Sequence, residues 1–262
     1  MPSNFTVQGV DTDDLFVLRS QTTLKYYNEL YAWGTNGSGE LGLSDTNSRS
    51  SPSQVGSLTN WSQISGARNN SNAIKIDGTL WSWGSGTSGA LGDGTTTSKS
   101  SPVQIGSLTN WQQVTTGLGF SIAIKTDGTL WSWGSGTFGV LGDGTTTSKS
   151  SPVQIGSLTN WYRISSSISH IISIKTDGTL WAWGRNDSGQ LGDGTRTHRS
   201  SPVQIGSLTN WSQVSAGGDH SLAIKTDGTL WSWGLNTNGQ LGDGTRTHRS
   251  SPVQIGSLTN WS

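Results

Sequence analysis

Short runs of alternating apolar and polar residues fill this chain, and no segment has the spacing of a helix. Residues 201–250 show the pattern most clearly. Their first run places Val203 and Ile205 between polar neighbours, directly after a proline, whose missing N–H does least harm at the start of a strand. Asp227-Gly228 predicts a tight hairpin, since a type I′ turn needs positive φ at both central positions. These signals predict four short antiparallel strands, at residues 201–206, 211–216, 221–226 and 230–234.

This four-strand pattern belongs to a unit of fifty residues that repeats without insertions or deletions. The segment SPVQIGSLTNW begins at Ser101, Ser151, Ser201 and Ser251, and a near-identical segment begins at Ser51. One such unit cannot bury its own apolar face, so a period of this length marks an array of stacked units. Four antiparallel strands per unit are typical of the blades of a β-propeller. An open solenoid is the structural competitor, but it normally needs polar capping repeats.

The two ends of the sequence suggest how the array closes. Residues 251–262 repeat the opening segment, whereas the first fifty residues lack it and align with the unit only from residue 21 to residue 34. We therefore predict an all-β propeller of five four-stranded antiparallel blades, forming one domain over residues 13–262. The intact repeats are 51–100, 101–150, 151–200 and 201–250, and residues 13–50 combine with 251–262 into a composite closing blade. Residues 1–12 remain as an N-terminal arm.

Composition narrows the possible functions. Hydrophobic residues make up only 30% of the chain, so its 14 Trp must supply much of the buried area, and its 37 Gly provide tight turns. Acidic and basic residues balance at 16 each, which argues against nucleic-acid binding. The absence of Cys excludes disulfides and cysteine metal sites. No signal peptide and no apolar run of about 18 residues is apparent, so we expect no membrane insertion and a virion or cytoplasmic location.

One repeat resembles a known family. The stretch AGGDHSLAIKTDGTLWSWGLNTNGQLGDGT, residues 216–245, resembles the regulator-of-chromosome-condensation repeat. Well-known members are seven-bladed propellers with a composite closing blade. The five repeats of this chain differ from that number. The family includes a chromatin-bound exchange factor for a small GTPase and secreted protein inhibitors of β-lactamase, so the resemblance implies protein recognition by loops on a rigid disc. The residues that carry it are Gly217, His220, Ser221, Leu222, Ala223, Asp227, Gly228, Trp233, Gly234, Asn236, Gly239, Gln240, Leu241 and Gly242.

The differences between the copies concentrate in three places. These are the turn after the WSQVSA-like strand, the loop after the LWSWG strand, and the TTSK or RTHR patch near residues 96, 146, 196 and 246. Strand alternation puts all three at one end of each blade, here called the variable edge, and the constant SLTNW and Asp-Gly segments at the other, the invariant edge. The variable edge is the predicted binding surface, and neutral drift of exposed loops is the alternative. The candidate residues are Arg68, Asn69, Asn70, Leu118, Phe120, Phe138, Ile168, His170, Arg185, Asp187, Asp219, His220, Leu235 and Asn236.

Catalytic chemistry is not evident in the sequence. Tryptophan at constant strand positions favours core packing over sugar stacking. His198 and His248 lie one period apart without a clustered carboxylate, and this pattern is weak evidence for a zinc site. Asp93 and its equivalents in LGDGT are interpreted as turn residues, because isolated carboxylates make poor calcium cages. We therefore predict no catalytic residues, no metal, no cofactor and no enzymatic activity.

The N-terminal arm gives the remaining functional hint. Residues 5–17 alternate like a strand and loosely resemble the attachment segments of phage structural proteins. The arm, through Phe5, Val7 and Val10, is predicted to dock onto other structural subunits by strand addition, or else to cover an outer blade edge. The leading interpretation is a structural module on a virion surface or tail that recognises a protein or a cell-surface glycan. The alternative is a regulator of one protein, similar to an exchange factor or an enzyme inhibitor. Self-association stays open.

Overall fold

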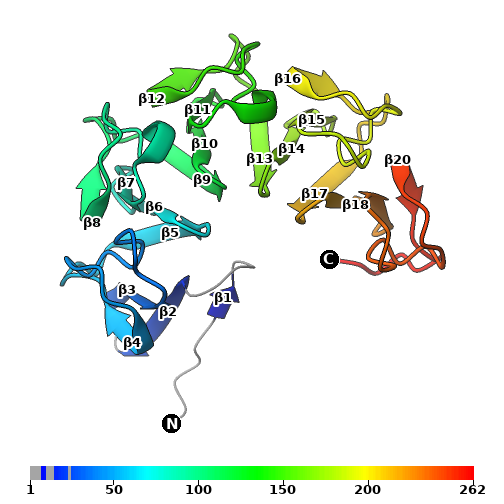
Figure 1. Ribbon diagram of the computed structural model, residues 1–262. Coiled ribbons are helices and arrows are strands. Elements are labelled where there is room, and N and C mark those ends of the chain that lie inside the picture. The colour runs from blue at the N-terminus through cyan, green and yellow to red at the C-terminus, as the bar shows by residue number, and fades with distance from the viewer. Residues whose placement is uncertain (1–6, 10–14, 23–24) are drawn as a thin grey trace.

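The computed structural model describes residues 7–9, 15–22 and 25–262. Within these residues the protein is a β-propeller of five four-stranded antiparallel sheets, as the sequence predicts. The sheets follow one another along an arc, with the first sheet at one end and the fifth at the other (Figure 1). Figure 1 shows a gap between the fifth sheet and the first, so the arc is open.

Each sheet uses four consecutive strands. The first sheet contains β1 (Val7–Gly9), β2 (Leu15–Thr22), β3 (Lys25–Gly34) and β4 (Arg49–Gln54). The second contains β5 (Trp61–Gly66), β6 (Asn70–Lys75), β7 (Leu80–Gly84) and β8 (Lys99–Gln104). The third contains β9 (Trp111–Gly117), β10 (Phe120–Lys125), β11 (Leu130–Gly134) and β12 (Lys149–Gln154). The fourth contains β13 (Trp161–Ser166), β14 (His170–Lys175), β15 (Leu180–Gly184) and β16 (Arg199–Gln204). The fifth contains β17 (Trp211–Ala216), β18 (His220–Lys225), β19 (Leu230–Gly234) and β20 (Arg249–Gln254). Two short 3₁₀ turns follow β7 and β11, namely η1 (Thr87–Gly89) and η2 (Thr137–Gly139).

The predicted order of strands within a blade is wrong by one strand. The SPVQIG segment is the fourth strand of its sheet, because the long polar loop folds it back against the LWSWG strand, with Trp131 opposite Gln154. The SLTN segment then crosses to the next sheet. The composite closing blade is therefore also wrong: β20 pairs with β19, with Trp231 opposite Gln254, and the first sheet consists of β1 to β4.

The boundary of the N-terminal arm also moves. Val7 belongs to β1, which pairs with β2 inside the first sheet, so these residues are part of the propeller instead of an arm outside it. Phe5 and Val10 lie outside the described residues.

The Asp-Gly hairpins occur where predicted, but their turn type differs. The Gly128 N–H donates to the Lys125 carbonyl at 2.9 Å, and φ is positive at Gly128 (+76°) but not at Asp127. A type I′ turn needs both. Only the glycine is left-handed here, which is the pattern of a hairpin with a slightly longer loop and a single left-handed residue.

The two tryptophans of each LWSWG strand have different environments. Trp133 is fully buried and packs with Ile74 and Leu80 of the preceding sheet, so it joins two blades. Trp131 is half-buried, and the Lys125 ammonium lies 3.6 Å from its ring centroid. The core prediction therefore holds fully for the second tryptophan of the pair and only partly for the first.

One face of the fifth sheet is less protected from solvent than the corresponding face of the fourth. All six residues of β14 are buried, whereas Leu222 and Ile224 of β18 are partly exposed because no described sheet packs over them. We expect backbone amides of β18 and β19 to exchange with deuterium faster than those of β14 and β15, since local opening is easier where fewer apolar contacts are lost. Exchange measured by mass spectrometry on the corresponding peptides, which are closely similar in sequence, tests this. Equal protection in the two sheets would contradict it.

Candidate functional site

In the second to fifth sheets, the structure gathers the variable segments at one end of the sheet. In the third sheet, the Ser135 N–H donates to the Gly119 carbonyl at 2.8 Å, which joins the loop after β11 to the β9–β10 turn. In the fourth, the Asn186 N–H donates to His198 Nδ1 at 3.0 Å, which brings in the RTHR patch. The constant segments meet at the other end, where the Thr126 N–H donates to the Asn110 carbonyl at 2.9 Å. The variable edge is therefore a real feature of these blades.

Five of the candidate residues line one pocket on this edge: one of them, Phe120, is buried in its wall, and the other four are at least partly exposed. Leu118 and Phe138 come from the third sheet, and Ile168 and Arg185 come from the fourth. The pocket has a volume of about 270 Å³. The three apolar side chains remain exposed, with 44% of Leu118, 38% of Phe138 and 53% of Ile168 accessible. These four residues are called the Phe138 cluster below.

Phe138 occupies a strained position. It lies in η2 with φ +59°, a left-handed conformation that costs a non-glycine residue about 1 kcal/mol or more. Phe138 is 38% exposed, so burial recovers only part of that cost. The ring is held in place by neighbours instead: the His198 ring lies edge-on with centroids 5.0 Å apart, and the Arg185 guanidinium lies 5.6 Å from the Phe138 centroid. Ser88 has the same left-handed backbone in the preceding repeat (φ +58°), so what distinguishes Phe138 is the partly exposed aromatic ring that this conformation presents.

Two carboxylates fix the orientation of Arg185. Its Nε donates to Asp187 Oδ2 at 2.6 Å, and its Nη1 donates to Asp219 Oδ1 at 3.3 Å, in the turn of the next sheet. The hydrogen bond to Asp187 and the charge of Asp219 raise the pKa of Arg185 despite its partial burial. His198 Nε2 lies 3.6 Å from Asp187 Oδ1 on the other side. The cluster therefore has a pre-oriented planar cation whose charge is already balanced.

The other candidates are either buried or lie outside the pocket. Asn70, Phe120, His170 and Asn236 are buried, so the structure does not offer them to a ligand at the surface. Asn236 instead organises its loop: its Nδ2 donates to the Thr245 and Thr247 carbonyls, each at 3.1 Å, and its Oδ1 accepts from the Leu241 N–H. Six exposed or partly exposed candidates do not line the pocket: Asp187 and Asp219, which accept hydrogen bonds from Arg185, Arg68 and Asn69 in the second sheet, and His220 and Leu235 in the fifth.

The sequence reasoning missed the part played by His198. From the sequence, His198 is interpreted only as a weak candidate metal ligand, although it lies in one of the three variable patches. Its Nδ1 accepts from the Asn186 N–H, and its ring contacts Phe138, so it supports the cluster from the next blade. The difference between Ser148 and His198 places this residue on the variable edge, but its contact with Phe138 crosses between two repeats and is not visible in the sequence.

No metal centre is evident in the described part of the chain. No group of three or more His, Cys, Asp or Glu residues is placed to hold an ion there. The LGDGT aspartates close turns, as predicted: Asp143 Oδ1 accepts from the Thr145 N–H at 2.9 Å and from the Thr145 hydroxyl at 2.8 Å. Over the same residues, no helix has the length and apolar character to cross a membrane.

The five four-stranded sheets and the loops at their variable edge define a β-propeller that presents a loop surface. The sequence matches the family model of the RCC1-like domain over residues 19–262, so the chain belongs to the RCC1-like domain family. It is similar to the structure of human WBSCR16, with a TM-score of 0.79 and 21% identity, over 93% of this chain and 65% of that one. It is also similar to yeast RCC1 (Prp20) bound to Kap60, with a TM-score of 0.79 and 21% identity, over 94% and 60% of the two chains. A further match is Prp20p from Saccharomyces cerevisiae, with a TM-score of 0.78 and 23% identity, over 94% and 62%.

These likenesses establish the fold and family. The chain spans less than two thirds of each of the three structures. A comparison with curated protein sequences finds no match. Neither the family match nor the similar structures support the expected phage or viral origin.

Proposed function

We propose that this protein is a non-enzymatic protein-binding module that contacts its partner through the Phe138 cluster. The observation that carries the proposal is the convergence of Leu118, Phe138 and Ile168 beside Arg185 on the variable edge. Aromatic side chains and arginine are enriched in protein-binding surfaces, and Leu118 and Ile168 extend the apolar area around Phe138 and Arg185. Family membership adds support, because the similar yeast structures concern a protein bound to Kap60 and binding to Gsp1p and histones.

Neutral drift of exposed loops accounts less well for this arrangement. At the position of Phe138 the other intact copies have Ser88, Ser188 and Asn238, all polar. The apolar residues Phe138, Leu118 and Ile168 fall on the adjacent third and fourth sheets, and a further apolar residue of the variable loops, Leu235, lies on the fifth. Drift would scatter such changes around the arc, whereas selection for one contact surface places them together.

The charge balance indicates the partner's chemistry. Because Asp187 and Asp219 already neutralise Arg185, the cluster does not attract an acidic partner by net charge. Its apolar side chains and the small pocket fit a protruding aliphatic or aromatic side chain of another protein. This favours a regulator that acts on a protein. The alternative role on a virion surface, with docking through Phe5, Val7 and Val10, rests on the N-terminal sequence alone.

Replacing Phe138 by Ser is expected to weaken partner binding by at least tenfold, because aromatic hot-spot residues contribute about 2 kcal/mol or more. The fold should tolerate the change, since Ser88 occupies the same position with φ +58° in the preceding repeat. The measurement is affinity capture from extract of the source organism with the wild-type chain, followed by titration of the captured protein against each variant.

The matched control is Ile76→Thr. Ile76 is 62% exposed on the invariant edge, and every other intact copy has Thr at its position. Both substitutions therefore remove an exposed apolar side chain by copying a sibling repeat. Binding that is lost with Ile76→Thr and kept with Phe138→Ser would place the contact on the invariant edge and refute the proposal.

A further inference from the structure

A second kind of pocket recurs between the outermost strands of neighbouring sheets. It has a volume of about 660 Å³ between the second and third sheets, about 630 Å³ between the third and fourth, and about 370 Å³ between the fourth and fifth. Each has an indole pair at its inner end, Trp111 with Trp131 in the first case, and a strand of SPVQIG sequence on either side. None of the residues of the Phe138 cluster lines these pockets.

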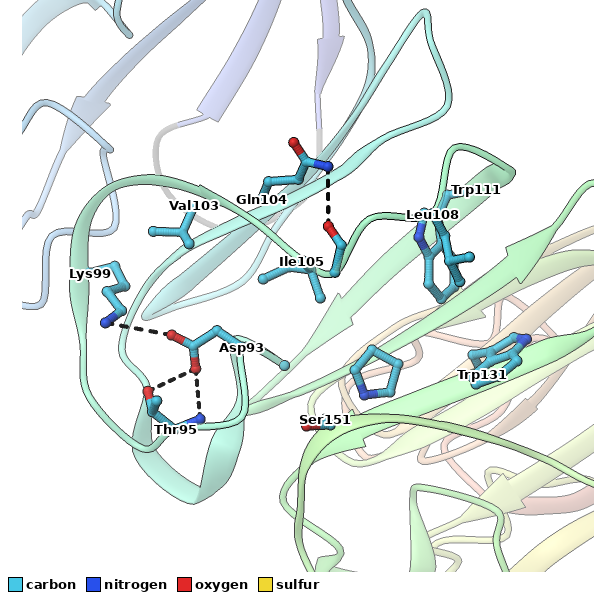
Figure 2. Close-up of a pocket in the computed structure, with 13 residues that line it drawn as sticks. Asp93, Thr95, Lys99, Val103, Gln104, Ile105, Leu108, Trp111, Trp131 and Ser151 are labelled. Atoms are coloured by element: carbon cyan, nitrogen blue, oxygen red, sulfur yellow. Dashed lines mark hydrogen bonds and ion pairs between the residues drawn. The ribbon is translucent and has the colours of Figure 1, made fainter.

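The aromatic end of each large pocket is rigid. Trp131 Nε1 donates to the Thr129 hydroxyl at 2.9 Å, and the Lys125 ammonium lies 3.6 Å from the Trp131 centroid. Trp111 packs edge-on against Trp131, with centroids 6.0 Å apart. Leu108, which is 46% exposed, lies beside them (Figure 2). A partly exposed indole held in this way is a pre-organised apolar platform.

The opposite end is polar and carries no net charge. Figure 2 shows Asp93, Thr95 and Lys99 grouped away from the two indoles. Asp93 Oδ1 accepts from the Thr95 N–H and hydroxyl at 2.9 and 2.8 Å, while its Oδ2 lies 3.6 Å from Lys99 Nζ. The lysine balances the carboxylate, yet both keep hydrogen-bonding capacity for a ligand because their contact is long.

We propose that the two large pockets are binding sites for neutral carbohydrate. A pyranose ring has an apolar C–H face that suits an indole and hydroxyl groups that both donate and accept hydrogen bonds, which suits Asp93, Lys99 and Gln104 together. Pockets of about 300–1,000 Å³ with aromatic walls and a few convergent polar groups are the usual form of small-ligand sites. Two copies on one rigid array would bind successive units of a polysaccharide with a gain from multivalency.

The third pocket supplies an internal comparison. There Arg199 replaces the lysine, and its Nε and Nη2 both contact Asp193 Oδ2, at 2.8 and 2.7 Å. The Arg199 guanidinium takes up the hydrogen-bonding capacity of the Asp193 carboxylate. This pocket is also the smallest of the three. Arginine at this position therefore closes the polar end, so the site between the fourth and fifth sheets should bind sugar poorly.

The test uses the full chain on an array of neutral oligosaccharides containing glucose, galactose, mannose or N-acetylhexosamine, with sialylated and sulfated glycans as charged probes. We expect binding of at least one neutral class, confirmed by titration calorimetry with two sites per chain. The double variant Lys99→Arg/Lys149→Arg copies Arg199, so it should fold, and it should lower the affinity at least tenfold. The Phe138→Ser variant should bind the same glycan unchanged, which separates this proposal from the protein-binding function.

Three results would overturn the proposal: no neutral glycan bound, tighter binding of the charged glycans, or unchanged affinity in the double variant. A second double variant, Leu108→Ser/Leu158→Ser, removes the exposed apolar side chain beside each indole pair without touching the polar end. It is also expected to lose at least tenfold in affinity. Full affinity in both double variants would place any bound sugar elsewhere on the protein.

Discussion

Replacing Gly128 by Ala is expected to destabilise the protein by about 3 kcal/mol or more, from backbone strain and steric overlap together. Gly128 has φ +76°, which disfavours any side chain. A Cβ at this position would also overlap the carbonyl group of Thr159, in the segment that leads into the fourth sheet. That carbonyl cannot move freely, because the Trp161 N–H in the same segment donates to the Gly128 carbonyl at 3.2 Å. The substitution therefore pushes two blades apart.

Gly156 provides a matched control. It also has positive φ (+61°), but a Cβ there would have nothing within 4 Å. Gly156→Ala should therefore cost about 1 kcal/mol, from backbone strain alone. Urea denaturation followed by tryptophan fluorescence measures both free energies of unfolding. Equal losses in the two variants would mean that the contact between the hairpin and the following blade contributes little to stability.

The strands could be predicted from sequence, but their grouping into sheets could not. Alternation and Asp-Gly turns located the strands because burial of one face imposes a period of two. The SPVQIG strand has a possible antiparallel neighbour on each side in sequence, LWSWG before it and the following tryptophan strand after it. Periodicity is the same for both pairings. The choice depends on the path of the polar loop, where glycines at positive φ such as Gly142 turn the chain back, and sequence alone does not specify that path.

The candidate site was only partly predictable, for a similar reason. Variation between copies singled out one edge of the blades, and five of the candidates line one pocket there. It did not separate Phe120, which is 1% exposed, from Phe138, which is 38% exposed, although both lie in variable segments. Phe120 is the first residue of β10, where it is enclosed by the adjoining sheets, whereas Phe138 is turned outward by its left-handed backbone. Burial of this kind depends on the neighbouring blade.

His170 has an unusual environment for an ionisable residue. It is fully buried, its Nδ1 lies 2.8 Å from the Ser167 hydroxyl, and its Nε2 lies 2.8 Å from the Ser221 hydroxyl. The Ser221 hydroxyl donates to the Gln190 carbonyl, so it accepts from a protonated Nε2, and Nδ1 then accepts from Ser167. Burial, with a smaller contribution from the charge of nearby His220, lowers the pKa of His170 from 6.5 to about 3. The imidazole is therefore neutral in the folded protein at neutral pH.

This depressed pKa predicts a loss of stability in acid. Between about pH 6.5 and pH 3 the unfolded chain binds a proton at His170 that the folded chain does not, so stability falls as the pH is lowered through that window. From pH 7 to pH 4 the contribution of this residue amounts to about 3 kcal/mol. Protonation of carboxylates adds to acid unfolding in any protein, so the comparison must be made with a variant that lacks only the imidazole.

The sibling repeats supply two such variants, since Phe120 and Asn70 occupy the position of His170 in other blades. Free energies of unfolding of the wild type, His170→Phe and His170→Asn, measured in urea at pH 7, 6, 5 and 4, are expected to diverge. The wild type should lose about 3 kcal/mol more than either variant over this range. A change in stability at pH 7 alone reports only packing and hydrogen bonding. Parallel pH curves for all three proteins would show that His170 titrates normally in the folded state, and hence that water reaches the space between the fourth and fifth sheets.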